Sequence, residues 1–243
     1  MNLVPENMLN IQNRYAYLKY RFRMFASRHW WLLNVVYGRL KKHRNLLIQN
    51  DTALVIEGYP RSANTFASRA FQGSNPDARI AHHMHAQAQI IEAVRRGLPA
   101  LVLIRHPDEA IKSMLVRHPH VGLRAAVLSY VQFYEDLEPL LDGYLLADFK
   151  QVTADFASII DQVNKRFGCQ FTRFEHSDSN VDKIFTDMDK DNRAFYGEYK
   201  VSHVPRPLAE RDKIKAYVNL DSEADLIARA RGVYQRLSGQ VIS

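Results

Sequence analysis

Nine residues, GYPRSANTF at positions 58–66, combine small, hydroxyl and basic side chains in the way that an anion-binding loop requires. They follow a run of apolar and β-branched residues and precede a segment with helical spacing, so they predict a tight turn between a strand and a helix. The free amides and the dipole at a helix N-terminus attract a phosphate group, and Arg61 adds a positive charge inside the turn. The alternative is that Pro60 and Ser62 only shape an ordinary turn.

The same nine residues lack the features of a nucleoside-triphosphate loop. That loop, GxxxxGK[ST], places a lysine against the outer phosphates, whereas this chain has Asn64 at the lysine position. The strand predicted at residues 100–104 is followed by Arg105 and not by an aspartate that would hold magnesium. The pattern therefore favours phosphate binding without the chemistry of magnesium triphosphates.

A second basic motif follows the strand predicted at residues 100–104. It consists of Arg105, Pro107 two residues later and Ser113 eight residues after the arginine. This motif and the segment YPRSANTF at 59–66 resemble the two donor-binding signatures of sulfotransferases that use PAPS (3′-phosphoadenosine 5′-phosphosulfate). The first signature of that family has the common form YPKSGTTW. The resemblance covers residues 52–215.

The resemblance implies that a sulfuryl group passes from PAPS to a hydroxyl or amine of an acceptor by in-line displacement, without a metal ion. The acceptor is a carbohydrate (glycan), a lipid or a small molecule, and the sequence does not distinguish these. It implies that Arg105 and Ser113 hold the 3′-phosphate, and that the 5′-phosphosulfate lies against Arg61, Ser62, Ala63, Asn64, Thr65 and Phe66. The family has a lysine at position 61. Because an arginine keeps its proton at neutral pH, we assign Arg61 to electrostatic stabilisation of the leaving group.

Three histidines, His82, His83 and His85, precede a predicted helix and are candidates for the catalytic base. Imidazole accepts a proton at neutral pH. Many members of the family have a histidine about 22 residues before the 3′-phosphate arginine, and His83 stands 22 residues before Arg105. We therefore expect His83 to be the base, with His85 as the alternative. A metal site is disfavoured because no carboxylate or cysteine stands at ligand spacing.

A basic segment near the C-terminus contains two further candidates. In the family a basic loop often closes over the 3′-phosphate, commonly as Arg-Lys-Gly, and this chain lacks that triplet. Arg206 and Arg211 are the predicted substitutes. The alternative is a solvated basic surface.

Residues 14–44 form a basic, aromatic segment with apolar residues at helical spacing. Three interpretations remain open: a helix packed on the main domain, a helix that binds a membrane surface or a partner, and a nucleic-acid contact. The net charge of +7 fits any anionic partner. Under the second interpretation, the segment would bring an enzyme that binds PAPS to a membrane surface by peripheral contact. No nucleic acid is expected as its partner.

The elements that would position these motifs alternate along the chain. Strands are predicted at residues 52–57, 100–104 and 144–147, with weaker ones at 78–81 and 170–174, and helices at 64–71, 86–96, 108–116, 123–141, 153–167 and 222–237. This alternation predicts an α/β fold with a mostly parallel central sheet flanked by helices, as in the P-loop-like fold of the sulfotransferases. We place an N-terminal helical extension at 1–50 and the sulfotransferase domain at 51–243.

The composition limits the remaining options. Apolar residues make up 47% of the chain and charged residues 24%, which predicts a folded globular protein. A single cysteine, Cys169, excludes an internal disulfide. The N-terminal sequence lacks the pattern of a signal peptide, so we expect a cytoplasmic protein. Two alternative functions remain: a P-loop kinase-like enzyme, which Asn64 disfavours, and a non-catalytic basic protein that binds nucleic acid or a membrane surface.

Overall fold

The central sheet consists of four parallel strands in the order β2-β1-β3-β4. The computed structural model describes residues 6–204, 206 and 208–239, with side chains described from residue 14 onward except those of residues 41 and 42. The strands are β1 (Thr52–Gly58), β2 (Arg79–His82), β3 (Ala100–Ile104) and β4 (Leu145–Asp148). The prediction of an α/β fold with a parallel sheet is confirmed.

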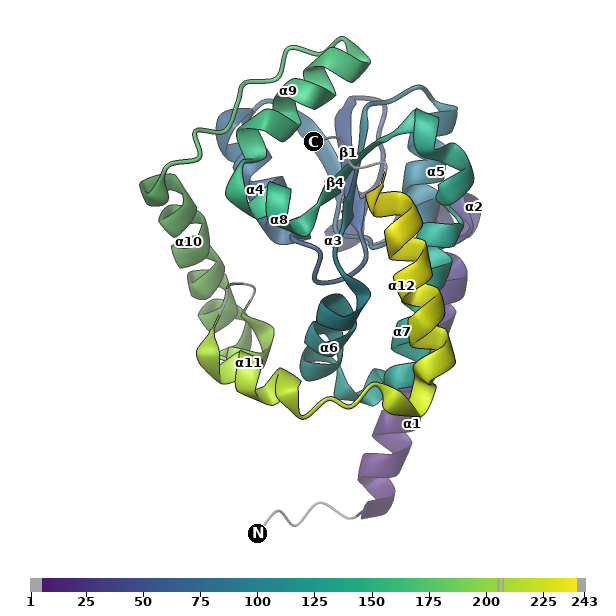
Figure 1. The fold of residues 1–243 in the computed structure, drawn as a ribbon. Helices are drawn as coiled ribbons and strands as arrows, with labels where there is room; N and C mark the ends of the chain where they lie inside the picture. The colour runs from purple at the N-terminus through teal and green to yellow at the C-terminus, as the bar shows by residue number, and fades with distance from the viewer. Residues whose placement is uncertain (1–5, 205, 207, 240–243) are drawn as a thin grey trace.

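Helices cover both faces of this sheet (Figure 1). Helices α4, α8, α9 and α10 contribute to the apolar core on one face, and α5, α6, α7 and α12 to the core on the other. The helices are α1 (Glu6–Ala26), α2 (Trp30–Tyr37), α3 (Lys41–Arg44), α4 (Asn64–Ser74), α5 (Gln87–Arg95), α6 (Pro107–Arg117), α7 (Leu123–Glu135), α8 (Phe149–Ala154), α9 (Phe156–Phe167), α10 (Asp178–Tyr196), α11 (Ala209–Ala216) and α12 (Ala224–Ser238).

Strand β3 shows why the sheet is buried on both sides. Leu101 and Leu103 pack into one core, whereas Val102 and Ile104 pack into the other. Because successive side chains of a strand point to opposite faces, an uninterrupted apolar run belongs to a strand with cover on both faces. This confirms the interpretation of residues 100–104.

The strand predicted at residues 170–174 is wrong. Two asparagine side chains take up the backbone groups that a neighbouring strand would otherwise bind. Asn75 accepts from the Thr172 amide at 2.8 Å and donates to its carbonyl at 2.9 Å, and Asn164 does the same for Phe171, at 2.8 and 2.9 Å. Side-chain amides can thus satisfy an extended segment outside the sheet.

Two predicted helices end earlier or divide. The helix predicted at 123–141 ends at Glu135, and a 3₁₀ turn, Glu138–Gly143, follows with a proline at its start. The helix predicted at 153–167 divides at Asp155, whose carboxylate accepts from the Ser158 amide and begins α9. Helices α10 and α11 were not predicted as elements. No helix in the described part of the chain is long and apolar enough to cross a bilayer.

Gly58 ends β1 and lies opposite Leu103 of β3. A Cβ atom at this position would overlap the carbonyl oxygen of Leu103 and lie 2.9 Å from its Cβ. We expect Gly58→Ala to lower the free energy of unfolding by about 1–3 kcal/mol, because a packed strand pair must move apart. Chemical denaturation measures this. The control is Gly73→Ala in α4, where an added Cβ meets nothing within 4 Å and should stabilise the helix by about 0.5–1 kcal/mol. Equal stability of the two variants would contradict the steric argument.

Candidate functional site

All four strands end at the same edge of the sheet, and the residues that follow them meet there. Residues 59–66, here called the 59–66 loop, follow β1, and the histidine loop, residues 82–85, begins at the end of β2. Arg105 follows β3 and Phe149 follows β4. Strands β1 and β3 are neighbours although β2 lies between them in sequence. This is the switch point at which open parallel sheets bind ligands.

The backbone of the 59–66 loop turns sharply through two left-handed residues, Arg61 (φ 75°) and Ala63 (φ 69°). Such residues are uncommon outside glycine, and they make successive amides point toward one side of a turn. The first hydrogen bond of α4 runs from the Ala67 amide to the Ala63 carbonyl. The amides of the preceding helical residues therefore have no carbonyl partner within the helix and suit an anion.

Two side chains of this loop shape it from inside. Asn64 is buried and donates to the carbonyl of Tyr59 at 3.0 Å. Phe66 packs in the core against Phe156 and Phe174. Because both side chains are engaged in these contacts, their backbone amides are the groups that these two residues could offer to a ligand.

Two arginines share one hydroxyl, and a third binds the backbone beside them. Arg61 Nε donates to Ser113 Oγ at 2.9 Å, and Arg211 Nη2 donates to the same oxygen at 2.7 Å. Arg105 Nη1 donates to the Arg61 carbonyl at 3.1 Å. Both Arg61 and Arg211 also donate to the carbonyl of Val204. We call Arg61, Arg105 and Arg211 around Ser113 the arginine cluster. It joins residues that the sequence had assigned to separate phosphate sites.

The arginine cluster carries more positive charge than its surroundings neutralise. Burial, then the charges of Arg211, Arg117 and Arg105, hold the pKa of Arg61 well below its usual range. In the described part of the chain, neither Arg61 nor Arg211 forms an ion pair with a carboxylate, and the buried Arg211 Nε has no hydrogen-bond partner. Such buried cations are costly unless an anion pairs with them. The cluster therefore fits a phosphate or sulfate group.

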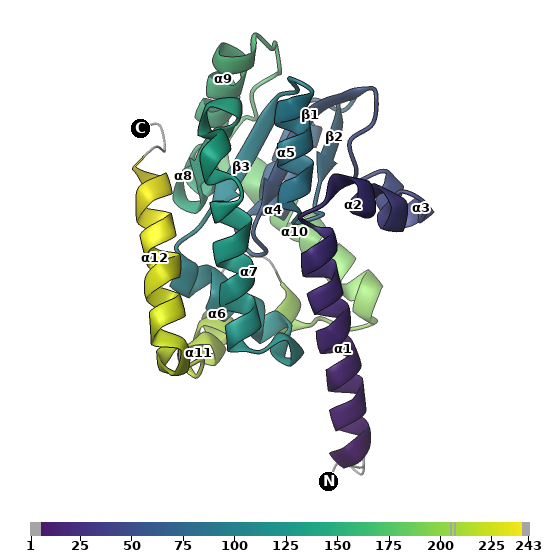
Figure 2. The ribbon, with the colours of Figure 1, turned by 90° about the vertical axis from the view of Figure 1, so that its right-hand side faces the viewer.

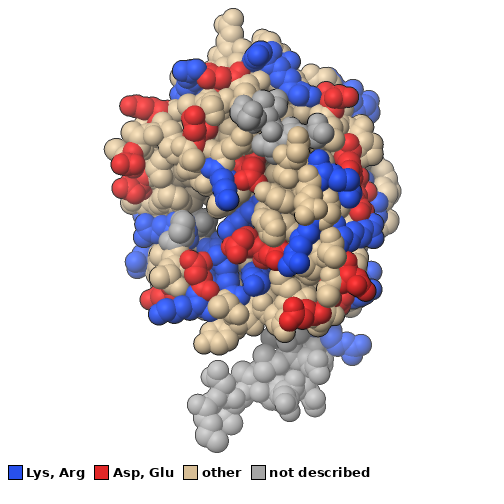
Figure 3. Space-filling model, viewed as in Figure 1, with Lys and Arg blue, Asp and Glu red and all other residues tan. Residues whose placement is uncertain are grey.

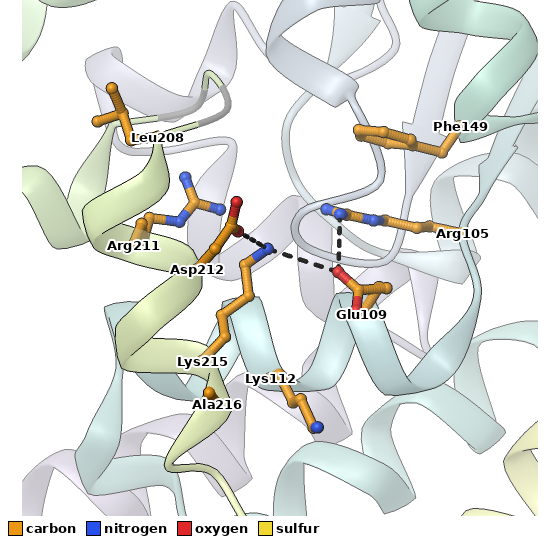
Figure 4. Close-up of a pocket in the computed structure, with 9 residues that line it drawn as sticks. All are labelled: Arg105, Glu109, Lys112, Phe149, Leu208, Arg211, Asp212, Lys215 and Ala216. Carbon is orange, nitrogen blue, oxygen red and sulfur yellow. Dashed lines mark hydrogen bonds and ion pairs between the residues drawn. The ribbon is translucent and has the colours of Figure 1, made fainter.

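A pocket of about 460 Å³ opens beside the arginine cluster (Figure 4). The Arg105 guanidinium lies 4.0 Å from the centre of the Phe149 ring. Glu109 accepts from both Arg105 and Lys215 at 3.4 Å, so this carboxylate competes for the cations at the rim. Figure 3 shows Lys, Arg, Asp and Glu side chains gathered around a hollow in this face of the molecule. The volume lies in the range of small-molecule sites.

The histidine loop lies against the 59–66 loop. His83 Nε2 is 3.0 Å from Thr65 Oγ1. His85 Nδ1 is 2.8 Å from the Gly58 carbonyl oxygen, and because a carbonyl only accepts, this nitrogen carries the proton. Both residues have left-handed backbones, with φ of 60° and 50°. Burial lowers the pKa of His83 well below its usual value and that of His85 to about 3, so both imidazoles are neutral at neutral pH.

Glu57 holds the histidine loop in place. Its buried carboxyl group accepts from the amides of Met84 and His85 at 2.8 and 2.7 Å, and from the Gln89 side chain at 2.9 Å. Burial raises the pKa of Glu57 to about 8, although these hydrogen bonds and the charge of Arg23 act in the opposite direction. The carboxyl group thus fixes both candidate bases without contacting the pocket.

Arg206 lies outside the arginine cluster, since its Nη2 pairs with Asp189 Oδ2 at 2.8 Å.

Within the described residues, no three histidine, cysteine or acidic side chains are arranged to hold a metal ion. Glu57, Phe149 and Arg117 are parts of the site that were not predicted from the sequence. The signals were an acid inside an apolar strand for Glu57 and a position just after a strand for Phe149. Arg117 donates to the His203 carbonyl at 3.3 Å and had no sequence signal.

Among known proteins, matches to this chain were found only with solved structures. No protein-family profile matches the chain, and no curated protein matches its sequence. Among solved structures, one that matches is mouse sulfotransferase SULT7A1 complexed with PAP. It is 12% identical, with a TM-score of 0.45 over 82% of this chain and 95% of that chain.

The raised pKa of Glu57 predicts a pH dependence of stability. When the pKa of a carboxyl group is higher in the folded state, its contribution to stability is fully present at a pH below its pKa in the unfolded chain. This contribution is lost as the pH rises through the folded pKa, to about 8 here. The buried histidines also change the free energy of unfolding with pH, but only below about pH 6.5. The effect of Glu57 is therefore tested between pH 6.5 and 8. There we expect the free energy of unfolding to fall by up to ~1.4 kcal/mol per pH unit.

Urea denaturation at several pH values measures this slope. Glu57→Gln should remove it, because an amide does not titrate, whereas the exposed control Glu175→Gln should keep it. A wild-type slope near zero between pH 6.5 and 8 would show that Glu57 is ionised when buried.

Proposed function

We propose that this protein transfers a sulfuryl group from PAPS to a hydroxyl or amine of an acceptor. The observation that carries the proposal is the arginine cluster. Arg61, Arg105 and Arg211 meet around Ser113 at the carboxyl ends of β1 and β3, beside the N-terminus of α4. A nucleotide with phosphate groups on both its 3′ and 5′ sides suits this concentration of cations, of which only Arg105 pairs with a carboxylate among the described residues.

We assign the two ends of the donor to the two sides of this cluster. The amides of the 59–66 loop and Arg61 would bind the 5′-phosphosulfate, and Arg105, Ser113 and Arg211 the 3′-phosphate. Arg61 would exchange its hydrogen bonds to Ser113 and the Val204 carbonyl for phosphate oxygens. Phe149, beside Arg105, would offer an apolar surface to the adenine ring of the donor. Arg206 would join only after leaving Asp189.

The transfer step needs a base and a stabilised leaving group. The acceptor oxygen or nitrogen would form a bond to sulfur while the bond from sulfur to the 5′-phosphate oxygen breaks, and its electron pair leaves on that oxygen. Arg61 and the loop amides would stabilise the new charge. His83 would accept the acceptor's proton, since it is neutral and lies beside Thr65. His85 is the alternative base. Its proton is on Nδ1, so its Nε2 is unprotonated and could accept a proton.

Donor selectivity separates this proposal from a kinase-like one. We expect PAP (3′-phosphoadenosine 5′-phosphate) to raise the melting temperature more than AMP, and ATP with magnesium to raise it least. A ligand at about 100 times its Kd stabilises the folded state by about 2.7 kcal/mol, which differential scanning fluorimetry detects. A larger shift with ATP and magnesium than with PAP would favour the kinase-like alternative.

Variants of the arginine cluster distinguish the two phosphate positions. We expect Arg105→Ala to weaken PAP binding at least tenfold and to leave AMP binding unchanged, because it removes a charge-assisted bond to the 3′-phosphate only. Arg61→Ala should weaken both ligands at least tenfold. Isothermal titration calorimetry measures all four affinities.

The matched control is Arg39→Ala, which removes one exposed positive charge from outside the site. It should leave both affinities at the wild-type level. If Arg105→Ala weakened AMP as strongly as PAP, the assignment of Arg105 to the 3′-phosphate would be wrong.

A further inference from the structure

The positive excess of this chain is concentrated in one segment. Residues 14–44 contain nine lysines and arginines and no aspartate or glutamate. Since the whole chain has a net charge of +7, the remainder carries −2. The arginine cluster therefore does not account for the basic isoelectric point. The segment that precedes the sheet does, which indicates an anionic partner for this segment itself.

The same segment exposes most of the large apolar side chains that face solvent. Eleven such residues are exposed in the described part of the chain, and eight of them lie between residues 15 and 40. They are Tyr15, Tyr17, Leu18, Phe22, Phe25, Trp31, Val35 and Leu40. Single exposed apolar residues are ordinary, but a concentration of them marks an interaction surface.

Four of these residues form a single stripe along α1. Tyr15, Leu18, Phe22 and Phe25 recur at steps of three and four, so at about 100° per residue they share one side of the helix. They are 70%, 64%, 49% and 57% exposed. We call them the outer stripe. Figure 2 shows α1 extending beyond the rest of the chain.

The opposite side of α1 is attached to the body of the protein. Tyr20 donates to Ser129 Oγ at 2.7 Å, Ser27 donates to Gln87 at 3.2 Å, and Arg23 donates to the Met84 carbonyl at 3.1 Å. Tyr20 and Ser27 lie about half a turn from the centre of the outer stripe. The orientation of the helix is therefore set by these contacts, and the outer stripe faces solvent as a consequence.

Exposed cations border the outer stripe on both sides. Arg14 and Arg21 lie along one border and Lys19 along the other, by their positions on the helix. The three-four spacing would also suit a coiled coil with a second copy. Cations at both borders would then face cations, and this repulsion disfavours such a pair. An apolar stripe with positive charge on both of its borders instead matches a surface of anionic lipid headgroups over acyl chains.

We infer that the outer stripe of α1 and the cations beside it bind the surface of an anionic lipid bilayer, with the helix axis in the plane of the interface. Beyond α1, Trp31, Val35 and Leu40 are also exposed. This surface is separate from the arginine cluster, so it does not depend on the proposed transfer reaction.

Vesicle co-sedimentation of the full chain tests this inference. We expect binding to vesicles of phosphatidylcholine with roughly 30 mol% phosphatidylserine, little binding to phosphatidylcholine alone, and weakening as salt screens the charges. The variant Leu18→Ser/Phe22→Ser/Phe25→Ser should bind anionic vesicles at least ~10-fold more weakly. The variant Arg14→Gln/Lys19→Gln/Arg21→Gln should lose the preference for anionic lipid.

Matched controls change the same chemistry elsewhere on the surface. Tyr217→Ser removes an apolar side chain that is 89% exposed, and Lys165→Gln/Arg166→Gln/Lys190→Gln removes three exposed cations. Both should bind vesicles like the wild type, and circular dichroism should show that every variant remains folded.

Three results would overturn the inference. One is wild-type binding that is absent, or equal on neutral and anionic vesicles. Another is unchanged vesicle binding after removal of the outer stripe, which would indicate that positive charge alone binds any polyanion. The last is a wild-type protein that does not bind vesicles but forms a dimer in sedimentation velocity, with the dimer lost in the outer-stripe variant. This result would assign the stripe to contact with a second copy of the chain.

Discussion

Repulsion between the arginines around Ser113 is the interaction on which the rest of the site depends. Arg61 and Arg211 share the Ser113 hydroxyl, and both donate to the Val204 carbonyl. These acceptors are neutral, so they orient the guanidinium groups without cancelling their charge. The only carboxylate paired with the cluster in the described residues is Glu109, at 3.4 Å from Arg105. A cluster held in this way is preorganised for a multiply charged anion.

The fold holds this charge by fixing the loops that carry it. Tyr134 of α7 donates to the Leu103 carbonyl at 2.8 Å, and Tyr130 donates to the Arg105 carbonyl at 2.7 Å. Tyr59 in turn donates to the Ala126 carbonyl at 3.0 Å. The hydroxyls of Tyr134 and Tyr130 satisfy backbone groups at the end of β3, and that of Tyr59 links the 59–66 loop to α7. The loops beside the arginine cluster are thus tied to α7, and Glu57 does the same for the histidine loop.

The local pattern of the sequence predicted the strands and most helices, because apolar spacing reports which face of an element is covered. It failed where a side chain replaced a backbone partner. Residues 170–174 have strand-like composition, yet Asn75 and Asn164 bind their backbone. It also could not show that Asn64 would bind the Tyr59 carbonyl, since that bond exists only once the 59–66 loop has turned.

The sequence by itself determined the positions of the four strands and of most helices along the chain. It also placed the 59–66 loop, Arg105 and the histidines after strand ends. Those features follow from residues close together in the chain. Only the tertiary structure decided that Arg211 would share a hydroxyl with Arg61, since Ser113 and Arg211 stand 98 residues apart. The burial of Glu57, the ring of Phe149 over Arg105 and the outward face of α1 were decided in the same way. Each depends on how helices pack on the sheet, and the spacing of apolar residues within a helix or strand does not specify that packing.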